Sequence, residues 1–160
     1  MTFAVKTSVP VAKTRIEIEK LLVAHKAYQH GTMMDDVAGV AYVAFTMGTG
    51  SQLRQVKITL PLPKRESFAR QHRRGRGMVL VSDVRRDKAF EQACRSKWRM
   101  LLLVLKANLE AIEAGVTTFE KAFFAFIRLP GGETLHDAVA PKLAHAYETG
   151  MVPPLLGTGS

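Results

Sequence analysis

Apolar and polar positions near the start of the chain repeat with a helical period. Residues 11–26 are rich in helix-forming side chains, and apolar residues recur there every three to four positions. Pro10 suits the first turn of a helix, because an N–H at that position would have no partner within the helix. The pattern predicts a helix over residues 11–26 whose inner face is formed by Ile18, Leu21, Leu22 and His25.

The period changes to alternation between residues 28 and 60. Val37–Met47 and Leu53–Leu60 both alternate between two faces and contain β-branched and aromatic residues, which is typical of strands. A shorter strand over Tyr28–Met34 would complete an antiparallel three-strand meander. Pro61 and Pro63 end the sheet, because proline has no N–H to donate to a neighbouring strand.

A second helical period, the longest in the chain, begins near Ser82 or Asp83 and continues to Glu113. Gly115 suits the left-handed position that follows the end of a helix. We expect this helix to be the main core element and its tryptophan to be a core residue. Its apolar stripe consists of Phe90, Cys94, Trp98, Leu101, Leu105, Leu109 and Ile112.

The C-terminal part of the chain predicts two further helices. A threonine at 117–118 can cap a short phenylalanine-rich helix, and residues 126–129 suit a short edge strand. Thr134–Thr149 has an apolar helical face, with Pro141 inside it, so we expect a kink or a restart at that proline. Residues 150–160 are predicted to form an extended tail.

Together these elements predict one α+β domain over residues 1–160. Its centre is an antiparallel three- to four-strand meander packed against the long central helix, with N- and C-terminal helices beside it. The length and the hydrophobic content of 47% are sufficient for a buried core.

Positive charge is concentrated in one third of the sequence. Residues 54–106 hold fifteen Lys or Arg against four acids, whereas all other residues together hold eight bases against ten acids. The formal net charge of +9 therefore comes entirely from this third. Such a concentration indicates a bound polyanion.

The segment from Lys64 to Gly77 has no apolar period, and Gly75 loosens its end. We expect a basic loop that is mobile when unbound and that orders on a phosphate backbone. The alternative is a solvated basic loop without a ligand. Met78–Val81 is a candidate fourth strand.

The predicted binding residues come from the sheet, the loop and the first half of the long helix. Phe68 lies within the basic loop without a periodic partner, so it is a candidate for stacking on a base. The expected phosphate-binding side chains are Arg54, Lys57, Arg70, Arg73, Arg74, Arg76, Lys88, Arg95 and Arg99.

The sequence contains no catalytic signature and predicts no metal and no cofactor. The histidines lack metal-ligand spacing, the glycines form no phosphate-binding loop, and Cys94 lies on the apolar stripe as a packed thiol. The longest uninterrupted apolar block, Met100–Leu105, is far too short to cross a membrane. We expect a soluble cytoplasmic protein.

A metal-dependent nuclease is one alternative. Asp35 or Asp36, followed two strands later by Gln55 and Lys57, faintly resembles the acid and (D/E/Q)-x-K arrangement of a large nuclease superfamily. In that arrangement carboxylates hold a divalent metal and the lysine steadies the attacking water. Here the second acid is a glutamine, and paired aspartates are also typical of a tight turn.

Five segments carry a resemblance over nearly the full length: KTSVPVAKTRIEIEKLL at 6–22, VKITLPLP at 56–63, EQACRSKWRMLLLVLKANLEAIEAG at 91–115, TTFEKAF at 117–123 and TGMVPPLL at 149–156. In these segments the chain resembles a group of small basic proteins encoded in phage and prophage genomes. That group has no settled activity, so the resemblance implies a phage-derived origin and no catalytic residues. MVLV at 78–81 departs from the charged linker of the group.

The order of helix, meander, basic loop and long helix is also similar in outline to phage single-strand annealing recombinases. That similarity implies single-stranded DNA held in a basic groove between sheet and helix, usually by a homo-oligomeric ring, and it carries no residue-level motif. The leading hypothesis is sequence-nonspecific binding of DNA or RNA in phage replication or recombination, with annealing as an added activity. The alternatives are an accessory protein that binds or inhibits an acidic host protein, and the nuclease.

Overall fold

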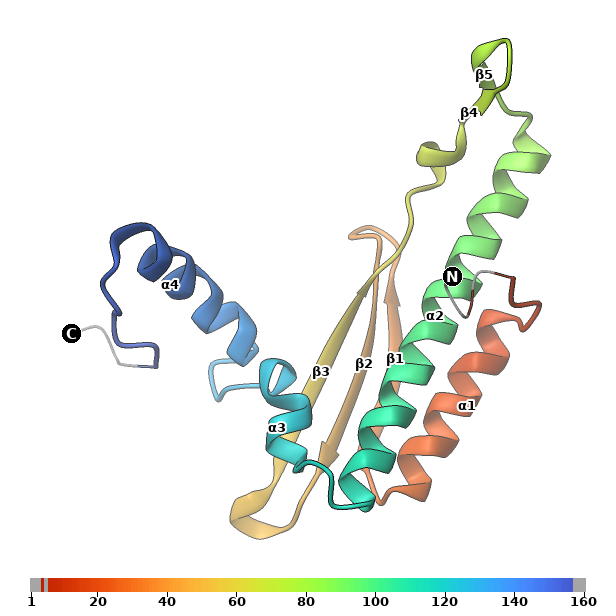
Figure 1. The fold of residues 1–160 in the computed structure, drawn as a ribbon. Coiled ribbons are helices and arrows are strands. Elements are labelled where there is room, and N and C mark those ends of the chain that lie inside the picture. The colour runs from red at the N-terminus through yellow and green to blue at the C-terminus, as the bar shows by residue number, and fades with distance from the viewer. Residues whose placement is uncertain (1–3, 5, 157–160) are drawn as a thin grey trace.

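The computed structural model describes Ala4 and residues 6–156, except for the side chains of His72 and Arg73. Helices, strands and short 3-10 turns follow one another along the chain (Figure 1). Their bounds are α1 Val11–Ala24, β1 Tyr28–Asp35, β2 Val40–Met47, η1 Gly50–Gln52, β3 Arg54–Pro61, η2 Arg65–Phe68, β4 Arg70–Arg73, β5 Gly77–Leu80, α2 Asp83–Glu113, α3 Phe119–Phe123, η3 Phe124–Phe126 and α4 Leu135–Thr149.

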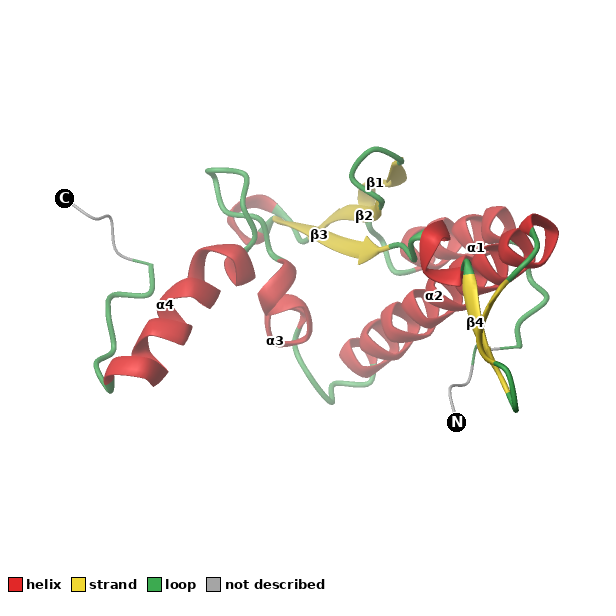
Figure 2. Ribbon diagram, turned by 90° about the horizontal axis from the view of Figure 1, so that it is seen from above, coloured by secondary structure: helices red, strands yellow, loops and turns green. Residues whose placement is uncertain are grey.

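The body of the molecule is an antiparallel sheet in the order β1-β2-β3, with α1 and α2 covering one of its faces (Figures 1 and 2). Alternation along β2 places Ala41, Val43 and Phe45 in the core, and Val56 and Ile58 of β3 join them. The α+β class and the meander packed on a long central helix are therefore confirmed. None of the helices in the described part of the chain is long and apolar enough to cross a membrane.

The central helix α2 contains 31 residues and supplies the largest share of the core. Trp98 is fully buried, as predicted, and the Arg15 guanidinium of α1 lies 5.8 Å from the centre of its ring. Leu101, Leu105 and Leu109 continue the buried stripe. Helix α1 buries Ile18 and Leu22 against the same core, so the two predicted helical faces meet.

The segment predicted as a structureless loop is a two-strand hairpin, β4 and β5, which extends beyond the sheet at the start of α2 (Figure 1). The three residues between Arg73 and Gly77 form its turn. Gly75 within the turn and Gly77 directly after it have φ of 79° and 65°, a left-handed conformation that favours glycine. The predicted fourth strand at 78–81 thus exists as β5 but belongs to this separate sheet. Val81 N donates to Ala69 O at 2.9 Å and closes the base of the hairpin.

The C-terminal elements leave the body along β3. Thr118 caps α3, and Phe123 contacts Phe45 edge to face with ring centres 5.4 Å apart. The predicted edge strand at 126–129 is reduced to two isolated bridges, Ile127 with Val56 of β3 and Arg128 with Thr134. Helix α4 is one continuous element through Pro141 and does not restart there. It stands away from the body, and within the described chain η3 is the one element that it contacts extensively (Figures 1 and 2).

Candidate nucleic-acid interface

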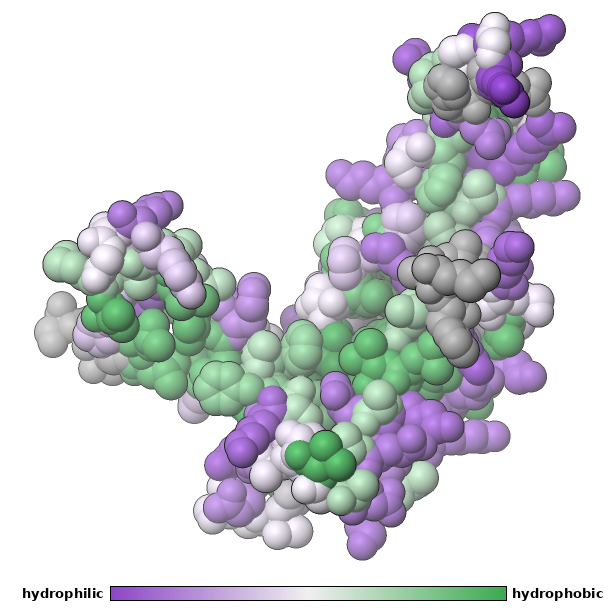
Figure 3. Space-filling view, viewed as in Figure 1, coloured by the Kyte–Doolittle hydropathy of each residue, from purple (hydrophilic) through white to green (hydrophobic). Residues whose placement is uncertain are grey.

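The strongest concentration of charge lies in residues 64–88, which we call the basic arm. It consists of η2, the hairpin and the first turns of α2. It contains nine Lys or Arg against three acids, a net charge of +6 out of the +9 of the whole chain. In the space-filling view hydrophilic side chains gather at the end of the molecule where the hairpin stands (Figure 3).

Two of the three acids in the arm pair with arginines, and one of these pairs joins η2 to α2. Asp87 accepts hydrogen bonds from Arg65 of η2, and the bond and charge of this carboxylate raise the pKa of Arg65. Arg86 lies 2.9 Å from the Asp83 carboxylate and 3.9 Å from that of Asp87. The Arg65–Asp87 pair holds η2 against the start of α2, whereas the Arg86 pairs lie within α2 itself, and together they neutralise only the base of the arm. The third acid, Glu66, is exposed.

The other described basic side chains of the arm are exposed and unpaired. They form no hydrogen bond or ion pair with any described residue, so their charge is not compensated within this part of the chain. The predicted contact Arg73 lies in β4, but its side chain is outside the described set. The unpaired side chains are Lys64, Arg70, Arg74, Arg76, Arg85 and Lys88.

Two of these cations, Lys64 and Arg85, were not among the predicted contacts. Arg85 lies in the first turn of α2, directly after the hairpin, and its nearness to the loop arginines in sequence was the available signal. The predicted stacking residue Phe68 lies in η2 and is half-buried, which leaves only part of its ring exposed.

Two predicted contacts on α2 are engaged within the protein. Arg95 donates to Glu91 one turn earlier at 3.1 Å, and Arg99 donates to Glu17 of α1. The second partner is 82 residues away in sequence, so the period of α2 alone does not reveal it. Positive charge that is free for a ligand therefore ends near Lys88 and does not continue down the helix as the predicted stripe did.

The predicted contacts on the sheet lie away from the arm. Arg54 donates to the carbonyl oxygens of Ser51 and Leu53 at 2.8 and 3.0 Å, at the start of β3. Because an eight-residue strand is roughly 25 Å long, Arg54 is separated from the arm by the full length of β3. Lys57 lies on the sheet face opposite the helices, 4.3 Å from the centre of the Tyr42 ring. The structure thus groups the hairpin cations with the start of α2 and leaves the sheet cations apart.

The residues of the nuclease alternative do not come together. The Asp35 carboxylate accepts a hydrogen bond from Ala38 N at 2.8 Å, so it stabilises the turn between β1 and β2, as aspartates in tight turns commonly do. On β2, Asp35 is opposite Val40 and Lys57 is opposite Ala44, so the two lie four residues, or about 13 Å, apart along the strands. Among the described residues no group of three His, Cys, Asp or Glu side chains is placed to share a metal ion.

Cys94 behaves as the packed thiol that its stripe position predicted. It is partly buried on α2 beside Pro10 and Val11 of the N-terminal segment. Burial raises the pKa of its thiol, with Lys97 opposing this weakly, so the reactive thiolate is disfavoured at neutral pH.

Comparison of the chain with protein-family models, with curated proteins and with solved structures finds no match in any of the three. Function therefore has to be argued from the arm itself. A narrow two-strand ribbon with unpaired arginines is suited to contacting regularly spaced negative charges.

Proposed function

We propose that the basic arm binds the phosphate backbone of nucleic acid without sequence preference. The observation that supports this most directly is the set of six unpaired, exposed cations at one end of the molecule, where the described residues provide no acidic partner. Unpaired cations in water gain little by staying together, because they repel one another. A phosphate backbone relieves that repulsion and releases its own bound counterions.

The shape of the arm also favours this ligand. A two-strand ribbon is narrow enough to enter the major groove of a duplex, about 12 Å wide, or to lie along a single strand. Arg70 on β4 and Arg74 and Arg76 at the turn would then contact phosphates, while Arg85 and Lys88 would contact the same strand from α2. Phe68 remains the proposed stacking residue for an unpaired base.

The biological setting that we propose is phage replication or recombination, with annealing of single strands as an added activity. This part rests on the resemblance of the chain to phage-encoded proteins and on its outline of helix, meander, basic segment and long helix. The alternative partner, an acidic host protein, would be attracted by the same cations.

The test compares a triple variant of the arm with a variant of equal charge elsewhere. Arg70, Arg74 and Arg76 are changed to Ala together, and in the control Lys13, Lys20 and Lys121, which are exposed on α1 and α3, are changed to Ala. Binding to labelled single- and double-stranded oligonucleotides of random sequence is measured by fluorescence anisotropy across a salt series.

We expect the arm variant to bind about 100-fold more weakly at roughly 0.1 M salt and to lose about two to three units of salt slope. The control should stay close to wild type. Equal losses in both variants would show that only net charge matters and would contradict a binding role for the arm. Absence of wild-type binding at low salt would favour the acidic host protein.

A further inference from the structure

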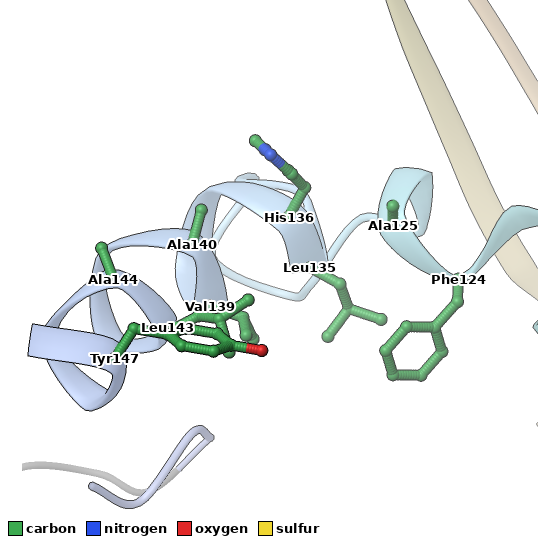
Figure 4. Close-up of a pocket in the computed structure, with 9 residues that line it drawn as sticks. All are labelled: Phe124, Ala125, Leu135, His136, Val139, Ala140, Leu143, Ala144 and Tyr147. Atoms are coloured by element: carbon green, nitrogen blue, oxygen red, sulfur yellow. The ribbon is translucent and has the colours of Figure 1, made fainter. Parts of the chain in front are cut away.

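Helix α4 has one apolar half and one polar half. The apolar half, together with η3, lines a shallow hollow of about 440 Å³, onto which Figure 4 looks. The polar half holds Asp137, Lys142, His145 and Glu148. The hollow contains no Lys, Arg, Asp or Glu, and it is lined by Phe124, Ala125, Leu135, His136, Val139, Ala140, Leu143, Ala144 and Tyr147.

The apolar half is covered at its start and open along the rest. Leu135 is 7% exposed, but Leu143 is 47% and Tyr147 is 84% exposed, and Phe124 beside them is 58% exposed. Green, hydrophobic side chains continue from α4 onto the adjoining surface in Figure 3. The open part is therefore a continuous apolar surface rather than a single exposed residue.

The sequence specifies α4 firmly even though the described chain gives it little to pack on. Thr134 and Asp137 form a capping box at its start, and Gly150 ends it in the left-handed conformation with φ of 71°. A helix of 15 residues is marginal in water on its own, because most helical stability comes from packing of the apolar face. Because α4 is capped but its apolar face is exposed, we expect another molecule to cover that face.

The described C-terminal tail is not that partner. Lys142 on the polar half donates to the carbonyl oxygens of Pro154 and Leu155 at 3.0 and 3.1 Å, which holds the tail beside α4. None of the described tail residues lines the hollow.

Charge indicates which partner fits. Residues 116–156 contain three bases and four acids, a net charge of −1, whereas the basic arm carries +6. A second copy of this basic chain would be repelled at the arm but not at α4. The arm and α4 also lie on opposite sides of the molecule (Figure 2), so copies joined through α4 keep their arms apart.

We infer that the apolar half of α4, with Phe124, is a self-association surface on which the α4 of a second copy packs about a two-fold axis. A two-fold contact places the same patch on both sides, and a patch without charge is complementary to itself. Ala140 and Ala144 border the row of larger side chains and allow two helices to approach closely. This inference goes beyond the proposed function and does not depend on it.

The available area suggests a dimer that dissociates on dilution. Buried aromatic side chains contribute about 150–250 Å² each, so the exposed parts of Phe124, Leu143 and Tyr147 offer on the order of 300 Å² per copy. Two copies supply about half of the roughly 1,200 Å² of a small stable interface. The other residues of the hollow supply part of the remainder.

The first test measures molar mass by sedimentation equilibrium over a wide range of protein concentration. Wild type should rise from the monomer mass of 17.7 kDa toward twice that value. Tyr147→Glu and Leu143→Glu, each placing a charge on the apolar half, should shift the midpoint of the transition at least tenfold upward. His145→Glu adds the same charge on the polar half of the same helix and should leave the midpoint unchanged.

The second test locates the contact. In a Cys94→Ala background, Leu143→Cys lies near the middle of the row and should be joined to its counterpart by a short bismaleimide, whereas His145→Cys should not. A monomeric wild type at all concentrations overturns the inference. So does a dimer that survives both glutamate substitutions, or one that cross-links only through position 145. A monomer whose α4 face captures a lipid vesicle or a different protein overturns it as well.

Discussion

The basic arm and α4 both extend from the same body, but they are held to it and exposed to solvent in different ways. The arm is anchored by the ion pair between Arg65 of η2 and Asp87 of α2, and it presents unpaired charge. Helix α4 is anchored through η3 and Leu135 and presents an uncharged apolar face. A surface of the first kind is suited to a salt-sensitive polyanion, and one of the second kind to a partner with a matching apolar face.

The largest effect is expected from the body that carries both regions. Changing Trp98, which is fully buried, to Ala should lower the free energy of unfolding by about 3–5 kcal/mol, because a large cavity is left between α1, α2 and the sheet. Urea unfolding measures this. Met100, 37% exposed on the same helix, provides the control, and its change to Ala should cost less than about 1 kcal/mol. A similar small loss at Trp98 would contradict the described core.

The next prediction couples the two regions. If α4 joins two copies, a long single strand contacts two arms at once and binds more tightly than a short one. Tyr147→Glu should then weaken binding of a long oligonucleotide by about 10- to 100-fold while leaving a short one nearly unaffected. His145→Glu is the matched control. If Tyr147→Glu changed the affinity for the long and the short oligonucleotide equally, self-association would not contribute to nucleic-acid binding, and each arm would bind independently.

A smaller effect concerns the anchor of the arm. Asp87→Asn frees Arg65 and removes the more distant of the two partners of Arg86, so affinity for an oligonucleotide should rise about threefold at constant salt. Asp83→Asn changes net charge by the same amount but leaves the Arg65–Asp87 pair intact and Arg86 beside Asp87. Anisotropy titrations of the two variants should therefore differ. Equal gains would mean that net charge, and not the release of specific arginines, determines affinity.

The body could be predicted from the sequence because its signals are local and repeated. The stripe through Trp98 and Leu105 recurs at helical spacing over many turns, and the alternation along β2 assigns Val43 and Phe45 to one face. Each further apolar position at the expected spacing supports the same assignment of helix or strand, so a single exception does not change it. The order of helix, meander and long helix followed from these patterns alone.

The candidate site could be predicted only in part, because it depends on contacts between distant segments. The pairing of Arg99 with Glu17 and of Arg65 with Asp87 removes cations that the charge pattern counted as free. The hairpin was missed because its four-residue strands carry hardly any apolar alternation and its register is set by the turn at Gly75. Charge density indicated the region in which the unpaired cations lie, but it did not indicate which cations were already paired.

The smallest predicted effect distinguishes α4 from the arm by pH. Hydrogen bonds from the side chain and the backbone N–H of Thr134 hold the pKa of Asp137 below its ordinary value of 3.8. The pKa of Asp137 is thus lower in the folded than in the unfolded protein. At a pH above the unfolded pKa the ionised carboxylate stabilises the start of α4, and this contribution is lost as the pH falls through the folded pKa.

Wild type should therefore lose a small part of its helical circular dichroism in acid that Asp137→Asn, which cannot titrate, does not lose. Glu148→Gln, an exposed acid at the other end of α4, should keep the wild-type profile. The arm responds differently, because its exposed arginines remain charged throughout this range. Acid should consequently weaken self-association through α4 while the positive charge of the arm is retained. A profile for Asp137→Asn identical to wild type would mean that the capping box contributes nothing to α4 in solution.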